Sequence, residues 1–129
     1  MNAAPTIMTL HLRYRLWIAE MNFDINVLRI FEDYIKELSS KNEQPEVTAG
    51  IADFKKKFGD IRKEIDDLRH EMHLHKMKLA SISRQGKQLD NGTYKADHHA
   101  ALKKQYINFR KKIEKLKSDF TDFENKWLN

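Results

Sequence analysis

Apolar residues recur every three or four positions through most of this chain. From residue 51 to residue 89 the steps alternate strictly between three and four, along Ile51, Phe54, Phe58, Ile61, Ile65, Leu68, Met72, His75, Leu79, Ile82, Gly86 and Leu89. A second row with the same period runs along Leu102, Tyr106, Phe109, Ile113, Leu116, Phe120, Phe123 and Trp127. A seven-residue repeat of this kind is typical of long amphipathic helices that pack side by side, so it predicts a helical bundle.

Turn signals divide the chain into three such helices. Pro5 with a threonine, Thr6 or Thr9, can begin the first helix, and the polar stretch around Pro45 ends it. The sequence Asp90-Asn91-Gly92 predicts the end of the second helix, because Asn and Gly accept the left-handed conformation. With Asp97 as a cap for the third helix, we expect one domain, 1–129, whose helices span about 6–40, 47–89 and 97–128.

The first helix has a core row of its own, with a shift of phase at Asp24 and Ile25. A turn at Gln44-Pro45 then pairs the first two helices so that facing residue numbers add to 89, which sets Tyr14 opposite His75. A second turn centred at Lys95-Ala96 gives sums of 191 or 192 and sets Leu116 opposite His75. The predicted fold is all-α, an up-down-up antiparallel three-helix bundle with long, coiled-coil-like helices.

The first helix also carries a second apolar row outside its core row: Leu16, Phe23, Val27, Ile30 and Tyr34. This row can simply be the widened stripe of a helix that packs against two others. It can also be an exposed surface that binds a second copy or another helical protein, since exposed apolar patches mark interfaces. We favour self-association, with an isologous homodimer as its commonest form.

Basic residues gather in segment 76–117. The segment has twelve basic and three acidic residues, a net charge of +9, whereas the rest of the chain carries −4 and the whole chain +5. In a bundle this segment forms a basic end around the second hairpin, and residues of the first helix join it. A basic end attracts polyanions such as nucleic acid or an anionic surface, with Arg13, Arg15, Lys103, Lys104, Arg110 and Lys111 as candidates.

The basic end can equally be a solvated surface. The aromatic residues of the basic tract are Tyr94, Tyr106 and Phe109, and the last two belong to a core row, so the tract has no aromatic stacking platform. No helix-turn-helix or other nucleic-acid reader motif is present either. Nucleic-acid binding is therefore the weaker hypothesis, and protein–protein contact the stronger one.

Two polar residues interrupt the core rows. His75 can hydrogen-bond the hydroxyl of Tyr14 or a water and so fix the register, or it can act as a pH switch, because protonating a buried imidazole destabilises its layer. Asp24 can lie at the rim, with Ile25 in the core. It can alternatively be buried and accept a hydrogen bond from the indole of Trp127.

Six histidines raise a metal-dependent site as a distant alternative. His70 and His73 lie one turn apart with Glu71 between them, but the inward positions at this level, such as Met72, are hydrocarbon. A metal site in a bundle needs inward-facing ligands from several helices, so we expect no metal and no cofactor. The glycines are isolated and no serine has a nucleophile-elbow context, so we expect no catalytic residues and no enzyme.

The amino-acid composition indicates the cellular compartment in which the protein is expected. The chain has no cysteine, which excludes disulfides and thiolate chemistry and suits a reducing environment. No stretch is long and apolar enough to span a membrane, and residues 1–12 lack the basic and apolar regions of a signal peptide. We therefore expect a cytoplasmic protein.

Three segments carry a resemblance to known proteins. These are the stretch from Glu20 to Ile30, the turn Leu68-Arg69-His70-Glu71, and the run from Phe109 to Lys117. Together they resemble short all-helical proteins of Bacteroidetes-type bacteria that have no assigned activity. The resemblance implies an all-helical fold and a bacterial, cytoplasmic origin, and it implies no site residue.

Overall fold

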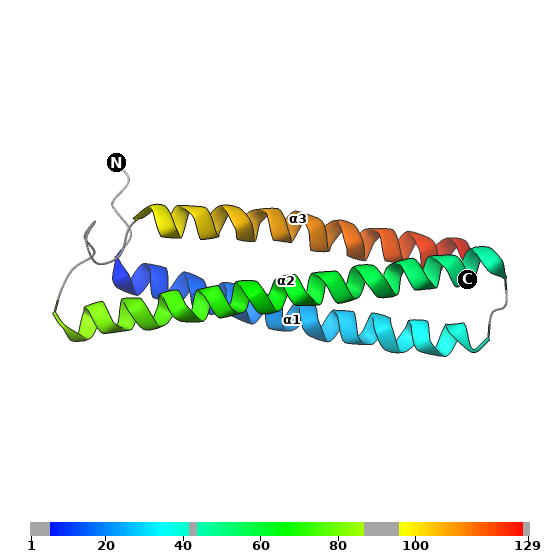
Figure 1. Ribbon diagram of the computed structural model, residues 1–129, viewed down its shortest axis with the longest axis horizontal. Helices are drawn as coiled ribbons and strands as arrows, with labels where there is room; N and C mark the ends of the chain where they lie inside the picture. Colours follow the sequence, from blue (N-terminus) through cyan, green and yellow to red (C-terminus); the bar gives the residue numbers. More distant parts are fainter. Residues whose placement is uncertain (1–5, 42–43, 87–95, 128–129) are drawn as a thin grey trace.

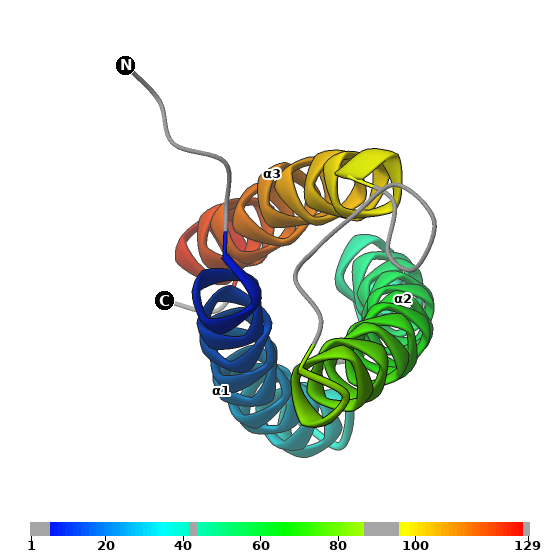
Figure 2. The same ribbon diagram turned by 90° about the vertical axis from the view of Figure 1, so that its left-hand side faces the viewer.

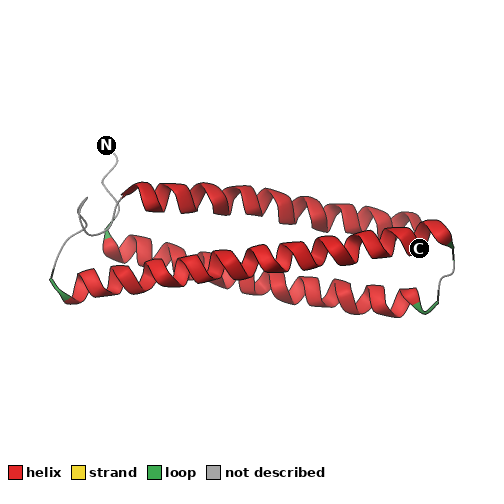
Figure 3. Cartoon of the chain, in the orientation of Figure 1, coloured by secondary structure: helices red, strands yellow, loops and turns green. Residues whose placement is uncertain are grey.

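Three long helices make up the described part of the protein. The computed structural model describes residues 6–41, 44–86 and 96–127. Helix α1 spans Ile7–Ser39, α2 spans Pro45–Arg84 and α3 spans Ala96–Trp127. α1 and α3 run in the same direction and α2 runs in the opposite one (Figure 1), which confirms the predicted up-down-up antiparallel bundle. No strand occurs among these residues (Figure 3), and no helix among them has a stretch apolar and long enough to cross a membrane.

The helix ends follow from local chemistry. The side chain of Thr6 accepts a hydrogen bond from the backbone N–H of Thr9 at 3.1 Å and so caps α1. Pro45 occupies the first turn of α2, where its missing N–H costs no hydrogen bond.

The prediction that the second helix reaches residue 89 is wrong. α2 ends at Arg84, and Gly86 adopts a φ of 68°, the left-handed conformation that terminates helices. The N–H of Gly86 donates to the carbonyl of Ser83 at 3.0 Å, which closes the last turn. Gly86 therefore acts as a stop signal and not as a member of the core row. The predicted stop at 90–92 and the predicted cap by Asp97 lie outside the described residues and side chains.

The predicted register of α1 against α2 is confirmed at both ends of the pair. The ring centroids of Phe31 and Phe58 lie 5.9 Å apart, and those of Tyr14 and His75 lie 5.6 Å apart. In each pair the residue numbers add to 89, as a turn at Gln44-Pro45 requires.

The predicted register of α3 is wrong by about two heptads. The ring of Phe120 packs against Phe54 at 5.3 Å and against Phe58 at 5.4 Å, and Lys112 donates to Glu64 at 3.2 Å. These pairs add to between 174 and 178, in place of 191 or 192. A shift by whole heptads keeps the same residues facing inward, so the apolar row alone does not choose between the two positions. Packing among the phenylalanines selects the observed one.

α2 lies closest to both other helices. In the described residues, the Cα traces of α1 and α3 nowhere approach within 8 Å of each other. Figure 2 looks along the bundle from the end where α1 and α3 begin and shows the three helices around a common axis. Since α1 and α3 stay apart, large side chains must fill the space between them. The buried polar residues, Asp24 and His99, lie in this space between α1 and α3, which we call the seam.

Candidate interaction surface and buried polar groups

A buried carboxylate lies at the centre of the seam between α1 and α3. Asp24 is fully buried, accepts a hydrogen bond from Arg110, and accepts another from Lys117 Nζ at 2.9 Å. The prediction that Asp24 sits at the rim is therefore wrong. The alternative of a buried Asp24 is right about burial but wrong about the partner, because α3 supplies two cations where Trp127 was expected. An ionised buried carboxylate needs such compensation.

Arg110 continues the polar network toward the surface. Its Nε lies 3.3 Å from a carboxylate oxygen of Glu20, and its Nη2 lies 2.8 Å from one of Glu114. The hydroxyl of Tyr106 donates to Glu20 as well, and burial followed by this hydrogen bond raises the pKa of the phenol far above its usual value. Arg110 is thus neutralised by three carboxylates within the chain. Its prediction as a polyanion-binding residue does not fit this environment.

A second polar group lies in the same seam near the start of α1. The hydroxyl of the fully buried Tyr14 lies 3.4 Å from His75 Nδ1 and 2.9 Å from His99 Nδ1. The predicted contact between Tyr14 and His75 is confirmed, but Leu116 is not in this layer. His99 was missed by sequence reasoning. A signal existed, because His99 lies three residues before Leu102 and so continues the core row of the third helix.

Burial favours neutral histidines in this group. A single phenolic hydroxyl donates to one Nδ1 and accepts from the other, so the two rings take opposite roles toward Tyr14. Burial is the main cause that lowers the pKa of both His75 and His99. The nearby charges of Arg13 and Lys103 lower the pKa of His99 further. Its Nε2 is buried without a hydrogen-bond partner among the described residues, so a proton there gains no acceptor.

Trp17 joins the two polar groups. Its ring stacks on His99 at 6.0 Å between centroids and on Tyr106 at 4.8 Å. The aromatic rings of the seam are therefore occupied by packing within the chain. They do not form an open platform on which bases could stack.

The outer apolar row of α1 divides into an exposed and a packed part. Leu16, Phe23 and Ile30 are exposed by 58%, 62% and 65%, at intervals of one heptad. Val27 is half-buried, and Tyr34 packs edge-on against Phe120 while its hydroxyl donates to Glu124 at 3.4 Å. The widened core stripe thus accounts for Val27 and Tyr34. It does not account for Leu16, Phe23 and Ile30, although Lys117 Nζ lies over the Phe23 ring, 5.8 Å from its centroid.

Other exposed apolar side chains do not extend this row across the molecule. Leu12 lies on α1 one turn before Leu16 and continues the row, whereas Leu74 and Met77 lie on α2 and Ile107 lies on α3. Scattered single residues of this kind are normal on a protein surface. Only α1 presents large apolar side chains along most of its length.

The basic end keeps five of its six candidates on or near the surface. None of Arg13, Arg15, Lys103, Lys104 and Lys111 forms an ion pair with a described residue. His70 and His73 are exposed on α2. Within the part of the chain that the structure describes, no three His, Asp or Glu side chains are placed to hold a metal ion.

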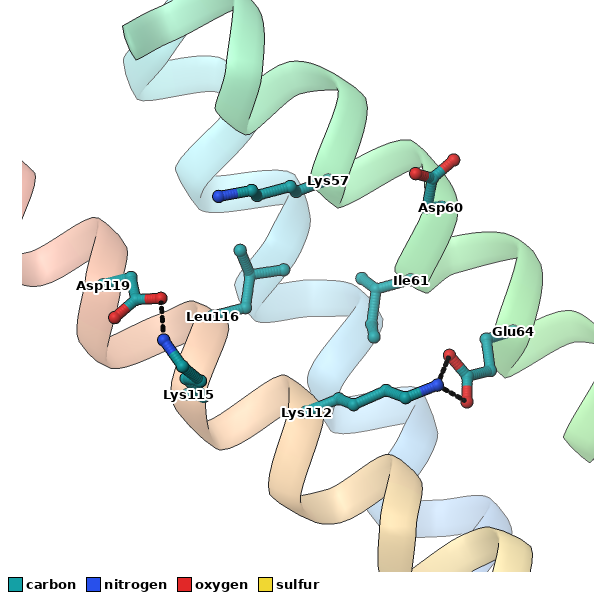
Figure 4. A pocket seen from close by; sticks show the side chains of 8 residues that line it. All are labelled: Lys57, Asp60, Ile61, Glu64, Lys112, Lys115, Leu116 and Asp119. Carbon is teal, nitrogen blue, oxygen red and sulfur yellow. Dashed lines mark hydrogen bonds and ion pairs between the residues drawn. The ribbon is translucent and has the colours of Figure 1, made fainter.

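A surface pocket of about 420 Å³ lies between α2 and α3 (Figure 4). Ile61 and Leu116 contribute its apolar lining, and six charged residues complete it: Lys57, Asp60, Glu64, Lys112, Lys115 and Asp119. Lys112 pairs with Glu64 and Lys115 pairs with Asp119. The lining has three positive and three negative side chains, so it carries no net charge that would favour a ligand of either sign. The sequence did not predict it, because it depends on the register of α3.

No protein-family model, no curated protein and no solved structure matches this chain. The resemblance to all-helical proteins of Bacteroidetes-type bacteria therefore stays a prediction.

Proposed function

We propose that this protein is a non-enzymatic helical bundle that acts through protein–protein contacts and associates with a second copy of itself through the outer row of α1. The observation that carries the proposal is the exposure of Leu16, Phe23 and Ile30 along one side of a helix. Removing apolar surface from water is worth about 25 cal/mol per Å², so contact between two such rows is favourable. The packed core beneath the row supports the use of α1 as a rigid docking surface.

Polyanion binding has weaker support. The α3 cations of the seam, Arg110 and Lys117, already compensate Asp24. Trp17 and Tyr106 are stacked inside the seam and do not present open faces. The remaining exposed cations supply attraction without any element that recognises a base.

Sedimentation velocity over a range of concentrations tests the proposal. We expect the unmodified chain to be a dimer at tens of micromolar, and we expect Phe23→Asp to be a folded monomer, because a carboxylate in the contact cannot be solvated. Met77→Asp is the matched control, since Met77 is equally exposed, by 67%, but lies on α2. It should leave the dimer intact. A chain that stays monomeric at these concentrations contradicts the proposal, and so does a Phe23→Asp variant that still dimerises.

A further inference from the structure

The outer row of α1 is symmetric about Phe23. With Leu12 and Ala19 included, both exposed, the row runs Leu12, Leu16, Ala19, Phe23, Val27, Ile30 and Tyr34. Its steps are four, three, four and then again four, three, four. The members before Phe23 lie 4, 7 and 11 residues away, and so do the members after it.

This symmetry is the one that an antiparallel pair of identical helices needs. A two-fold axis at Phe23 sets each residue opposite a partner residue so that the two numbers add to 46. Leu16 then faces Ile30, the half-buried Val27 faces the small Ala19, and Phe23 meets its own copy. The repeat from Leu12 through Phe23 to Tyr34 is eleven residues, which favours a right-handed and not a left-handed crossing of the two helices.

The positions of charged residues favour an antiparallel pair over a parallel one. A parallel pair also sets apolar residues together, but it places the basic end of one copy beside the basic end of the other. An antiparallel pair places Arg15 of one copy about one turn or less from Asp33 of the other, on the same flank of the row. Neither residue forms an ion pair with a described residue of its own chain.

We propose that a second copy of the chain docks antiparallel on α1, across a two-fold axis at Phe23, with Leu16 of each copy facing Ile30 of the other. This inference rests on the proposed self-association and adds its geometry. Opposite ends of the two molecules then lie together, and the exposed row of each copy is covered by the row of its partner.

Cross-linking with single cysteines tests the geometry, because the chain has no cysteine of its own. The Leu16→Cys and Ile30→Cys variants are prepared separately, and one of them carries a mass tag. Three samples are treated with a short bismaleimide: each variant by itself, and a mixture of the two that has been unfolded and refolded together. In the antiparallel dimer, two copies of the same cysteine are fourteen residues apart along the axis, about 21 Å at 1.5 Å per residue. We therefore expect a cross-linked product in the mixture, with the mass of the mixed dimer, and little in either protein alone.

The outcomes separate the geometry from the self-association. Sedimentation of each variant shows whether it is a dimer, and circular dichroism shows whether it is folded. If each variant cross-links with itself, the pair is parallel and the inference fails while the proposed function stands. The inference is overturned if the variants are dimers but the mixture gives no cross-linked product, and a mixture of Ala19→Cys with Val27→Cys gives none either. The contact then lies elsewhere. A monomeric parent chain overturns the inference and the proposed function together.

Discussion

At the scale of single residues, Asp24 shows how one polar side chain determines its surroundings. Its carboxylate is fully buried, and Arg110 and Lys117 both reach it from α3. Both cations are themselves mostly buried, with side chains exposed by 22% and 19%. Inside the seam, the two cations thus offset the cost of burying the carboxylate. Loss of the carboxylate leaves two cations without their buried partner.

We expect Asp24→Ala to lower the free energy of unfolding by about 3 kcal/mol, the low end for breaking a buried pair, because the two cations can partly turn to solvent. Urea unfolding followed by circular dichroism measures the change. Glu114→Ala is the matched control, since Glu114 contacts the same Arg110 from the surface at 2.8 Å. Its loss should cost less than about 1 kcal/mol, as is usual for an exposed pair. Equal losses in the two variants would mean that burial adds nothing to the Asp24 contacts.

At the scale of helices, α2 is the element whose backbone lies close to both neighbours, and its two glycines lie in different surroundings. A methyl group at Gly50 would collide with the ring of Phe123, which packs against this turn of α2. A methyl group at Gly59 would meet nothing within 4 Å. Gly50 therefore permits a close approach of α3, whereas Gly59 only adds flexibility to the unfolded chain.

Gly59→Ala is expected to raise the free energy of unfolding by about 0.5 to 1 kcal/mol, the difference in helix propensity between the two residues. Gly50→Ala should gain the same propensity but lose more through displacement of Phe123, so we expect a lower stability than that of the parent. Thermal and urea unfolding of both variants measure the difference. A Gly50→Ala variant as stable as Gly59→Ala would contradict the observed packing of α3.

At the scale of the whole molecule, the group of Tyr14, His75 and His99 connects all three helices. Arg13 faces it from α1, Glu71 and Lys78 from α2, and His98 and Lys103 from α3. Among these charges only Glu71 raises the pKa of His75, and burial outweighs it. The folded state therefore resists protonation at the half-buried His75 and at the buried His99.

The bundle is therefore expected to lose stability in mild acid. An unfolded histidine titrates near pH 6.5, whereas the folded pKa of His75 and His99 is lower, so below about pH 6.5 the unfolded state binds more protons. The free energy of unfolding should fall as the pH drops from there and level off once the pH passes the folded values. Urea unfolding between pH 8 and pH 5.5 measures this slope.

Substitution identifies the groups responsible. His99→Leu and His75→Leu should each reduce the dependence on pH, whereas His70→Leu should leave it unchanged because His70 is exposed on α2. The same slope in all three variants and the parent would contradict a role for His75 and His99.

Three helices, the register of α1 against α2, the contact of Tyr14 with His75 and the extra apolar row on α1 could all be predicted from the sequence. These features depend on period and on a short turn, both of which are local. The position of α3, the burial of Asp24 between Arg110 and Lys117, and the contact of His99 with Tyr14 could not be predicted, because a heptad row specifies which face of a helix turns inward but leaves its axial position free in steps of seven residues. Packing of Phe120 among the other phenylalanines and the pairing of buried charges select one step, and that selection requires the helices to be together.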